Sequence, residues 1–179
     1  MREPTIARNY ADALFELGER SGETERYAQL MSGFGAVLNA EPHIRVVLES
    51  PRVTKERKLA ILESTFSPLA GAEFTRFLHA VVRRGRHGLF PVIAEQYSHL
   101  VDEKFNRVRV SVTVAREPDA RMVASIRDQL SAAMGKEAIP SFHTKAEILG
   151  GVILRVGDRI MDGSLRRKMK ALRKRMLSA

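Results

Sequence analysis

Residue types that could carry out chemistry are present in this sequence, but their spacing does not match the motifs that such chemistry requires. Gly135-Lys136-Glu137 lacks the upstream glycine and the hydroxyl residue of a phosphate-binding loop. Asp158 and Asp162 resemble part of a calcium loop, but the oxygen ligands between them are missing. Solvated turn carboxylates are the simpler interpretation, so neither segment indicates a ligand site.

The histidine and cysteine content gives no catalytic pattern either. No HxxxH or HExxH pair occurs among the five histidines, which we interpret as surface or edge residues: His43, His79, His87, His99 and His143. With no cysteine, the chain has no thiolate metal site and no cysteine nucleophile. We therefore expect no catalytic residues, no metal and no cofactor, and a small enzyme is the least favoured of the possible functions.

The net charge of +9 is concentrated in the last part of the chain. Residues 1–105 hold 14 basic and 14 acidic residues, which leaves 16 of the 30 basic and 7 of the 21 acidic residues for 106–179. This asymmetry indicates two units with different partners. We find no signal peptide in residues 1–20, and no stretch approaches the ~20 apolar residues of a membrane span. We expect a soluble, cytoplasmic protein.

Amphipathic patterning in residues 1–105 predicts a bundle of six short helices. The first has Thr5 as its N-cap and ends at Gly18 or at Ser21-Gly22. All six are expected over these ranges: 5–17, 23–38, 42–48, 54–66, 69–84 and 91–105. The N-terminal unit is therefore a helical bundle.

At Asn106 the hydrophobic period changes from that of a helix to that of a strand. Residues 107–114 alternate between valine and polar side chains, which predicts a half-buried strand. A helix ending at Gly135 follows, then an edge strand over 139–144 and a hairpin over 152–161. The predicted fold is α+β overall, with an N-terminal six-helix bundle (1–105) followed by a small C-terminal α+β domain (106–179).

The segment from 165 to 176 is predicted to be a basic amphipathic helix. Its apolar stripe has helical spacing, with Leu165, Met169, Leu172 and Met176, and seven of the residues between them are Lys or Arg. Three interpretations remain open: a solvated basic face over a packed stripe, a contact with an acidic protein, and nucleic-acid binding through counterion release. The helix has no aromatic stacking residue and no nucleic-acid-binding signature beside it.

Two features of the helical unit also have more than one interpretation. Arg83-Arg84-Gly85-Arg86 could bind phosphate, but arginine at a helix end more often compensates the helix dipole. The small-residue face of the first helix is core by default, and a groove for a partner helix is the alternative.

Several segments carry a resemblance to a known family. Residues 150–164, GGVILRVGDRIMDGS, resemble the C-terminal signature of the ATP synthase delta subunit, whose mitochondrial counterpart is the oligomycin-sensitivity-conferring protein. Residues 7–15, ARNYADALF, are similar to the opening of that family. Arg84 departs from the asparagine that the family has before Gly-Arg. The resemblance spans nearly the whole chain in the same order.

The resemblance implies a non-catalytic stator subunit of the F-type ATP synthase, which ties the catalytic head to the peripheral stalk. The bundle would bind the N-terminal helix of an alpha subunit between its first and fifth helices, through Ala7, Tyr10, Ala11, Leu14, Phe77, Ala80, Val81 and Arg84. The C-terminal domain would contact the b (or b/b′) subunits of the stalk through Leu165, Arg166, Met169, Leu172 and Arg173.

The resemblance also implies one copy per complex, at the cytoplasmic face of the cell membrane, with membrane contact only through the complex and without nucleic acid. The alternative function is a basic nucleic-acid-binding, ribosome-associated module. That module would show strongly salt-dependent binding to RNA or DNA.

Overall fold

The computed structural model describes residues 3–50 and 52–177, and the chain divides into two compact units, Met1–Val101 and Asp102–Ala179. The sequence predicts the boundary between residues 105 and 106. Asp102, in the last turn of a helix, forms an ion pair with Arg109 of the following strand, at 2.6 Å from Nε to Oδ2. Both residues belong to the second unit, so this ion pair places the last turn of that helix within the second unit.

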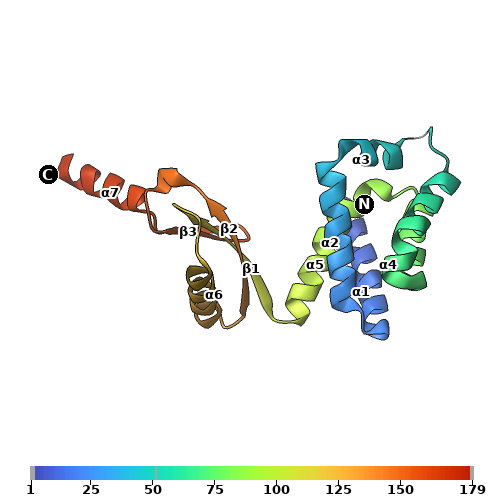
Figure 1. Ribbon diagram of the computed structural model, residues 1–179, viewed down its shortest axis with the longest axis horizontal. Coiled ribbons are helices and arrows are strands. Elements are labelled where there is room, and N and C mark those ends of the chain that lie inside the picture. Colours follow the sequence, from blue (N-terminus) through green and yellow to red (C-terminus); the bar gives the residue numbers. More distant parts are fainter. Residues whose placement is uncertain (1–2, 51, 178–179) are drawn as a thin grey trace. The chain divides into compact units, whose positions relative to one another are not determined.

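The first unit consists of helices joined by short connections (Figure 1). Its elements are α1 (Glu3–Ser21), α2 (Thr24–Ala40), α3 (Pro42–Glu49), α4 (Lys55–Arg83), the 3-10 turn η1 (His87–Leu89) and α5 (Phe90–Lys104). Gly71, with φ 72° and ψ −177°, breaks α4 into a first arm (55–70) and a second arm (72–83). The two arms correspond to the fourth and fifth predicted helices, so the six-helix bundle is confirmed over the residues described.

Glycines set the ends of these helices, and one end differs from the prediction. The break in α4 lies at Gly71 rather than between residues 66 and 69, because a φ of 72° is accessible to glycine at little cost. The first helix continues through Gly18 and ends at Ser21, which is the second of the two predicted ends, and Gly22 follows with a φ of 71°. A Cβ on Gly18 would lie 2.9 Å from Tyr97 Oη, so this glycine permits close packing instead of ending the helix.

One hydrophobic core holds the helical unit together. Phe34 of α2 packs with ring centroids 5.1 Å from Phe66 and 5.0 Å from Phe90, which joins α2 to the first arm of α4 and to α5. Tyr97 is fully buried, and its hydroxyl donates to the carbonyl of Thr24 at 3.0 Å. Burial and the negative charge of nearby Glu19 raise the pKa of Tyr97, so the phenol stays a protonated donor.

The second unit is built on a sheet with the strand order β2-β1-β3-β4 within the residues described. Its elements are β1 (Arg107–Val114), α6 (Ala120–Met134), β2 (Glu137–Thr144), the 3-10 turn η2 (Ala146–Ile148), β3 (Val152–Val156), β4 (Arg159–Asp162) and α7 (Leu165–Leu177). β1 pairs in parallel with β2 and antiparallel with β3, and β3 pairs antiparallel with β4. The predicted C-terminal α+β domain is confirmed.

The alternating valines of β1 form the core of this sheet. Val110, Val112 and Val114 are buried and pack with Leu130 of α6. Pro140 lies in β2, which is an edge strand as predicted, because proline has no N–H to donate to a further strand.

Candidate partner-docking surfaces

The residues expected to bind an alpha subunit come together where α1 meets the second arm of α4. Ala7, Ala11 and Leu14 of α1 are fully buried, as is Val81, and Phe77 is nearly so. All five belong to the hydrophobic core of the first unit. Substituting any of them would change the stability of the fold as well as any surface above it.

Three of the expected residues reach the surface of this seam. Tyr10 is partly exposed and packs edge-on against Phe77, with the ring centroids 6.3 Å apart. Ala80 is exposed on the second arm of α4, and Arg84, which caps this arm, is exposed as well. We call Tyr10, Ala80 and Arg84 the seam surface, because a partner helix laid over α1 and α4 would contact these side chains first.

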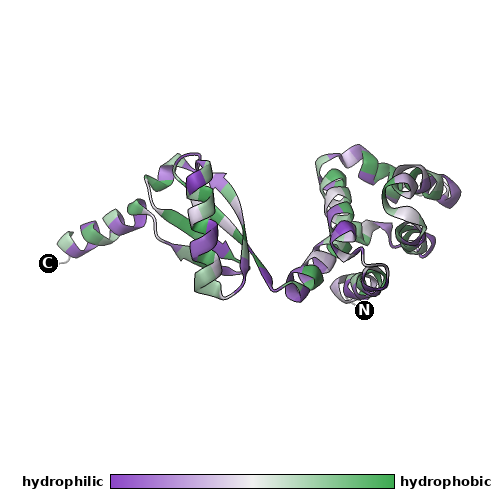
Figure 2. Cartoon of the chain, turned by 60° about the horizontal axis from the view of Figure 1, so that its bottom comes forward, coloured by the Kyte–Doolittle hydropathy of each residue, from purple (hydrophilic) through white to green (hydrophobic). Residues whose placement is uncertain are grey.

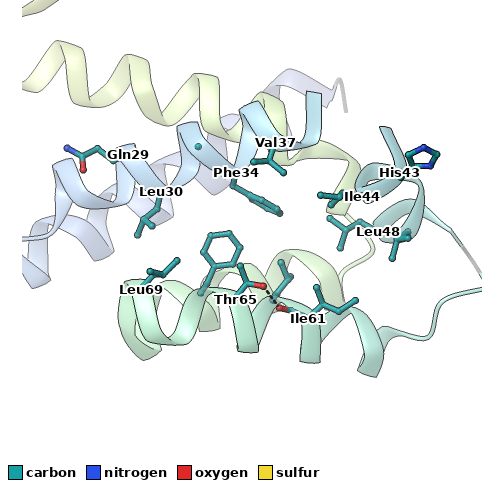
Figure 3. Close-up of a pocket in the computed structure, with 14 residues that line it drawn as sticks. Gln29, Leu30, Phe34, Val37, His43, Ile44, Leu48, Ile61, Thr65 and Leu69 are labelled. Carbon is teal, nitrogen blue, oxygen red and sulfur yellow. Dashed lines mark hydrogen bonds between the residues drawn. The ribbon is translucent and has the colours of Figure 1, made fainter. Parts of the chain in front are cut away.

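A second, apolar surface, which the sequence pattern does not predict, lies between α2, α3 and the first arm of α4. It is a groove of about 600 Å³ (Figure 3), lined by Gln29, Leu30, Gly33, Phe34, Val37, His43, Ile44, Val47, Leu48, Ile61, Leu62, Thr65, Phe66 and Leu69. None of these lining residues is Lys, Arg, Asp or Glu. Val37, Ile44 and Val47 are each at least 40% exposed. Helical periodicity marks such residues as inward-facing and does not tell a closed core from an open groove.

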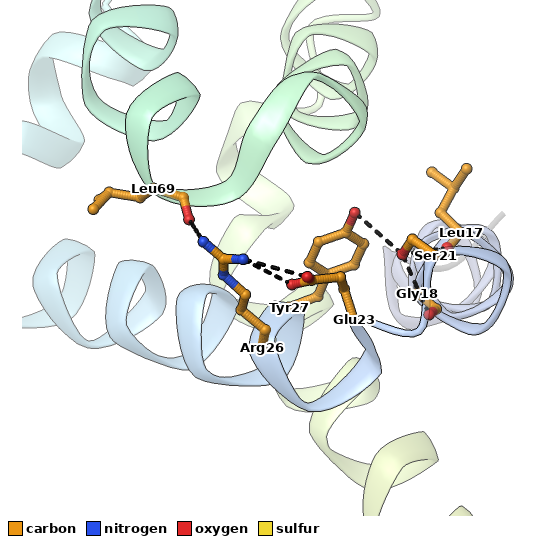
Figure 4. A network of polar contacts seen from close by, with 7 residues as sticks. All are labelled: Leu17, Gly18, Ser21, Glu23, Arg26, Tyr27 and Leu69. Carbon is orange, nitrogen blue, oxygen red and sulfur yellow. Dashed lines mark hydrogen bonds and ion pairs between the residues drawn. The ribbon is translucent and has the colours of Figure 1, made fainter.

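A polar network fixes the Leu69 end of this groove (Figure 4). Arg26 of α2 donates through Nη2 to the carbonyl of Leu69 and pairs through Nη1 with Glu23 at 3.1 Å. The carbonyl of Leu69 belongs to the last turn before the break at Gly71, where helix carbonyls lose their partners within the helix. Arg26 thus caps the first arm of α4 and holds it against α2.

The expected stalk-binding helix α7 has no buried residue. Its apolar stripe is open to solvent, with exposed fractions from 46% for Leu165 to 80% for Met176, and Met169 and Leu172 lie between these values. Figure 2 shows hydrophilic and hydrophobic residues alternating along this helix, next to the C-terminus. In a sequence, a stripe of this kind predicts packing, but in the structure each of these four side chains is at least 46% exposed.

The glycine-rich signature determines how α7 leaves the sheet. A Cβ on Gly151 would lie 2.4 Å from the carbonyl oxygen of Gly163, so the two backbones can approach this closely only with glycine. Ser164 then caps α7 by accepting from the N–H of Arg167 at 3.2 Å. Asp162 accepts from the N–H of Ser164 at 2.9 Å. A hydrogen bond from the Ser164 side chain, this backbone hydrogen bond and the nearby charge of Arg167 lower the pKa of the Asp162 carboxyl.

The titratable residues do not converge on a reaction centre in the part of the chain that the structure describes. No group of three or more His, Cys, Asp or Glu residues that could hold a metal occurs among the described residues. His79 pairs with Glu63 at 3.1 Å, and burial, with a smaller contribution from Lys58, lowers the pKa of His87. Among the helices described, none is long and apolar enough to cross a membrane.

Comparison with known proteins assigns the chain to a family. The family model described as ATP synthase delta (OSCP) subunit matches residues 6–176. The chain belongs to this family. The resemblance seen in the sequence is therefore confirmed for the delta (OSCP) family over nearly the whole chain, and the alternative of a nucleic-acid-binding module gains no support.

Individual relatives agree with the family assignment. The chain is 40% identical over 172 residues to ATP synthase subunit delta of Gemmatimonas aurantiaca, covering 96% of this chain and 93% of the relative. It is 31% identical over 178 residues to the Chlorobium phaeobacteroides subunit, covering 99% and 98%. A chain in the cryo-EM structure of the Toxoplasma gondii mitochondrial ATP synthase hexamer shares the fold, with a TM-score of 0.72 at 16% identity, over 96% of this chain and 97% of that chain.

Proposed function

We propose that this delta-family chain is a non-catalytic stator subunit of an F-type, proton-translocating ATP synthase. Proton flow turns a rotor against the catalytic head, and the head synthesises ATP only if it does not turn with the rotor. A subunit that binds the head with one unit and the peripheral stalk with the other transmits the reaction torque to the membrane. The observation that carries this proposal is the family assignment over residues 6–176.

The first contact in the proposal is between the helical unit and the N-terminal helix of an alpha subunit. The partner helix lies along the seam surface, with Tyr10 and Ala80 beneath its apolar face. Tyr10 supports this role because its ring is already ordered against Phe77, so little side-chain entropy is lost on binding. A helix seated on an apolar seam dissociates slowly, which torque transmission requires.

The second contact is between α7 and the b (or b/b′) subunits of the stalk. An exposed stripe of large apolar side chains is supporting evidence for an interface, because such stripes are otherwise packed. Arg166 and Arg173, exposed beside the stripe, would face acidic residues of the stalk. We place one copy in each complex, at the cytoplasmic face of the membrane and attached to it only through the other subunits.

Calorimetric titration of the full chain with a peptide copying the N-terminal segment of the same organism's alpha subunit tests the first contact. We expect tight binding with a negative heat-capacity change, because apolar area is buried. Ala80→Asp should abolish binding. Val37→Asp, which places the same charge in the groove lined by α2, α3 and α4, should leave binding unchanged. If Val37→Asp abolishes binding and Ala80→Asp does not, the peptide binds in the groove instead. If the unsubstituted chain does not bind the peptide, the proposal is contradicted.

A further inference from the structure

The second arm of α4 and the residue that caps it carry a cluster of positive side chains that have no acidic partner among the described residues. Arg76, Arg83 and Arg84 line a hollow of about 400 Å³ together with His79 and Ala80. All three arginines are exposed, and no carboxylate of the described residues lies within 4.0 Å of their guanidinium groups. Of the residues that line the hollow, His79 pairs with a carboxylate, at 3.1 Å from its Nε2 to Oε2 of Glu63. We call Arg76, Arg83 and Arg84 the arginine cluster.

Compensation of the helix dipole does not account for the cluster. Its effect is confined to the last turn of a helix, and Arg76 lies two turns before the end of α4 at Arg83. The carbonyl of Arg83, at that end, already accepts from Lys55 Nζ at 3.4 Å. Arg76 has neither a carboxylate partner among the described residues nor a helix end beside it, so an external anion explains its position better than the fold does.

The geometry of the helix defines the kind of anion. Ala80 lies four residues after Arg76 and four before Arg84, so Arg76, Ala80 and Arg84 share one face of the helix. Ala80 has the smallest side chain of the three and lines the hollow between the two arginines. Arg76 and Arg84 are separated by about 12 Å along the axis at 1.5 Å per residue. This separation fits carboxylates about two turns apart on a partner helix, and guanidinium groups bind carboxylates in a paired, planar geometry.

Because Ala80 and Arg84 belong both to this hollow and to the seam surface, we infer that the helix docked on the seam is acidic along its edge nearest Arg76, Arg83 and Arg84. This inference rests on the proposed function and adds the chemistry of the partner. Apolar contacts over Tyr10 and Ala80 provide slow dissociation, while the arginine cluster sets the direction and register of the helix and speeds its association. Binding should therefore weaken as salt is added, although the contacts over Tyr10 and Ala80 are apolar.

Titration of the full chain with the alpha-subunit peptide at about 50 mM and 500 mM NaCl tests the inference. We expect the double variant Arg76→Gln/Arg84→Gln to bind about tenfold more weakly at low salt and to lose most of the salt dependence. Arg121→Gln on α6, an exposed arginine of the other unit, is the matched control and should bind as the unsubstituted chain does. Replacing the peptide's acidic residues by glutamine should reproduce the effect of the double variant.

The outcomes separate this inference from the proposed function. If the double variant binds the peptide with unchanged affinity and salt dependence, the inference of an acidic edge on the partner helix is wrong. The proposed stator function would not be affected by this result. If the unsubstituted chain does not bind the peptide, the proposed docking itself fails. If a duplex RNA binds more tightly than the peptide and the double variant abolishes that binding, the cluster is a nucleic-acid site and the inference is overturned.

Discussion

Tyr10 packs edge-on against Phe77 across the seam between α1 and the second arm of α4, with ring centroids 6.3 Å apart. Phe77 is buried and Tyr10 is partly exposed, so one ring of the pair belongs to the core and the other to the surface. This pair connects the stability of the bundle to the contact proposed for the alpha subunit. Substitutions at Tyr10 can therefore change docking at a modest cost to folding.

The first prediction concerns coupling. Tyr10→Asp should uncouple head from stalk, because a carboxylate on the seam is desolvated when an apolar helix covers it. We expect membranes carrying this variant to lose most proton-driven ATP synthesis, while the detached head hydrolyses ATP at its normal rate. Tyr10→Phe keeps the ring contact and should be nearly normal. A Tyr10→Asp variant that impairs hydrolysis by the detached head itself would count against a purely mechanical role.

A second prediction concerns Gly151. Gly151→Ala should destabilise the second unit by about 2–4 kcal/mol, because φ is 76° and the new Cβ would meet the Gly163 carbonyl oxygen. Gly135→Ala is the matched control: φ is 63° but the space is open, so we expect only about 1–2 kcal/mol. The chain has no Trp, and its three tyrosines lie in the first unit, so hydrogen exchange of the β1 amides is the measurement. Equal effects of the two substitutions would contradict the close backbone approach.

The third prediction separates folding from binding in α7. Met169→Asp with Leu172→Asp should change the free energy of unfolding by less than about 0.5 kcal/mol, because neither side chain is buried. The same variant should fail to bind the cytoplasmic part of the b subunit. Val110→Asp, in the core of the sheet, should instead unfold the second unit. Loss of folding in the α7 variant would show that the stripe packs within this chain.

The fourth prediction is a pH dependence that arises from His87. Burial and the nearby ammonium of Lys58 lower its pKa from the ordinary value of 6.5, so the unfolded chain binds the proton more readily. The contribution is therefore fully present above pH 6.5 and is lost as the pH falls below it toward the pKa of the folded state. His87→Asn should flatten this part of the stability curve, as followed by tyrosine fluorescence in urea. A curve unchanged by the substitution would assign the pH dependence to other groups.

Much of the fold was predictable because local patterns and tertiary packing agree. The valines of β1 alternate in the sequence and are buried in the same order, and Pro140 places β2 at an edge. The sequence predicts the break in α4 between residues 66 and 69, whereas the chain bends at Gly71. Periodicity locates a turn to within a few residues, but the exact position depends on which backbone can adopt a positive φ.

The docking surfaces were only partly predictable for a physical reason. Apolar periodicity marks the face of a helix that avoids water, but a core and an interface both satisfy it. Ala7 and Ala11 therefore looked the same in the sequence as Ala80, although only Ala80 is exposed. Likewise, the apolar residues of α3 gave no sign that Ile44 and Val47 line an open groove while Leu48 is buried.

Sedimentation velocity of a mixture of the catalytic head, the cytoplasmic part of the b subunits and this chain tests the central claim most directly. We predict one large complex that contains all three components, which forms only when this chain is present. Ala80→Asp should release the head and Met169→Asp should release the b subunits, each leaving the other contact intact. A complex of head and stalk that forms equally well without this chain would contradict its role as the link between them.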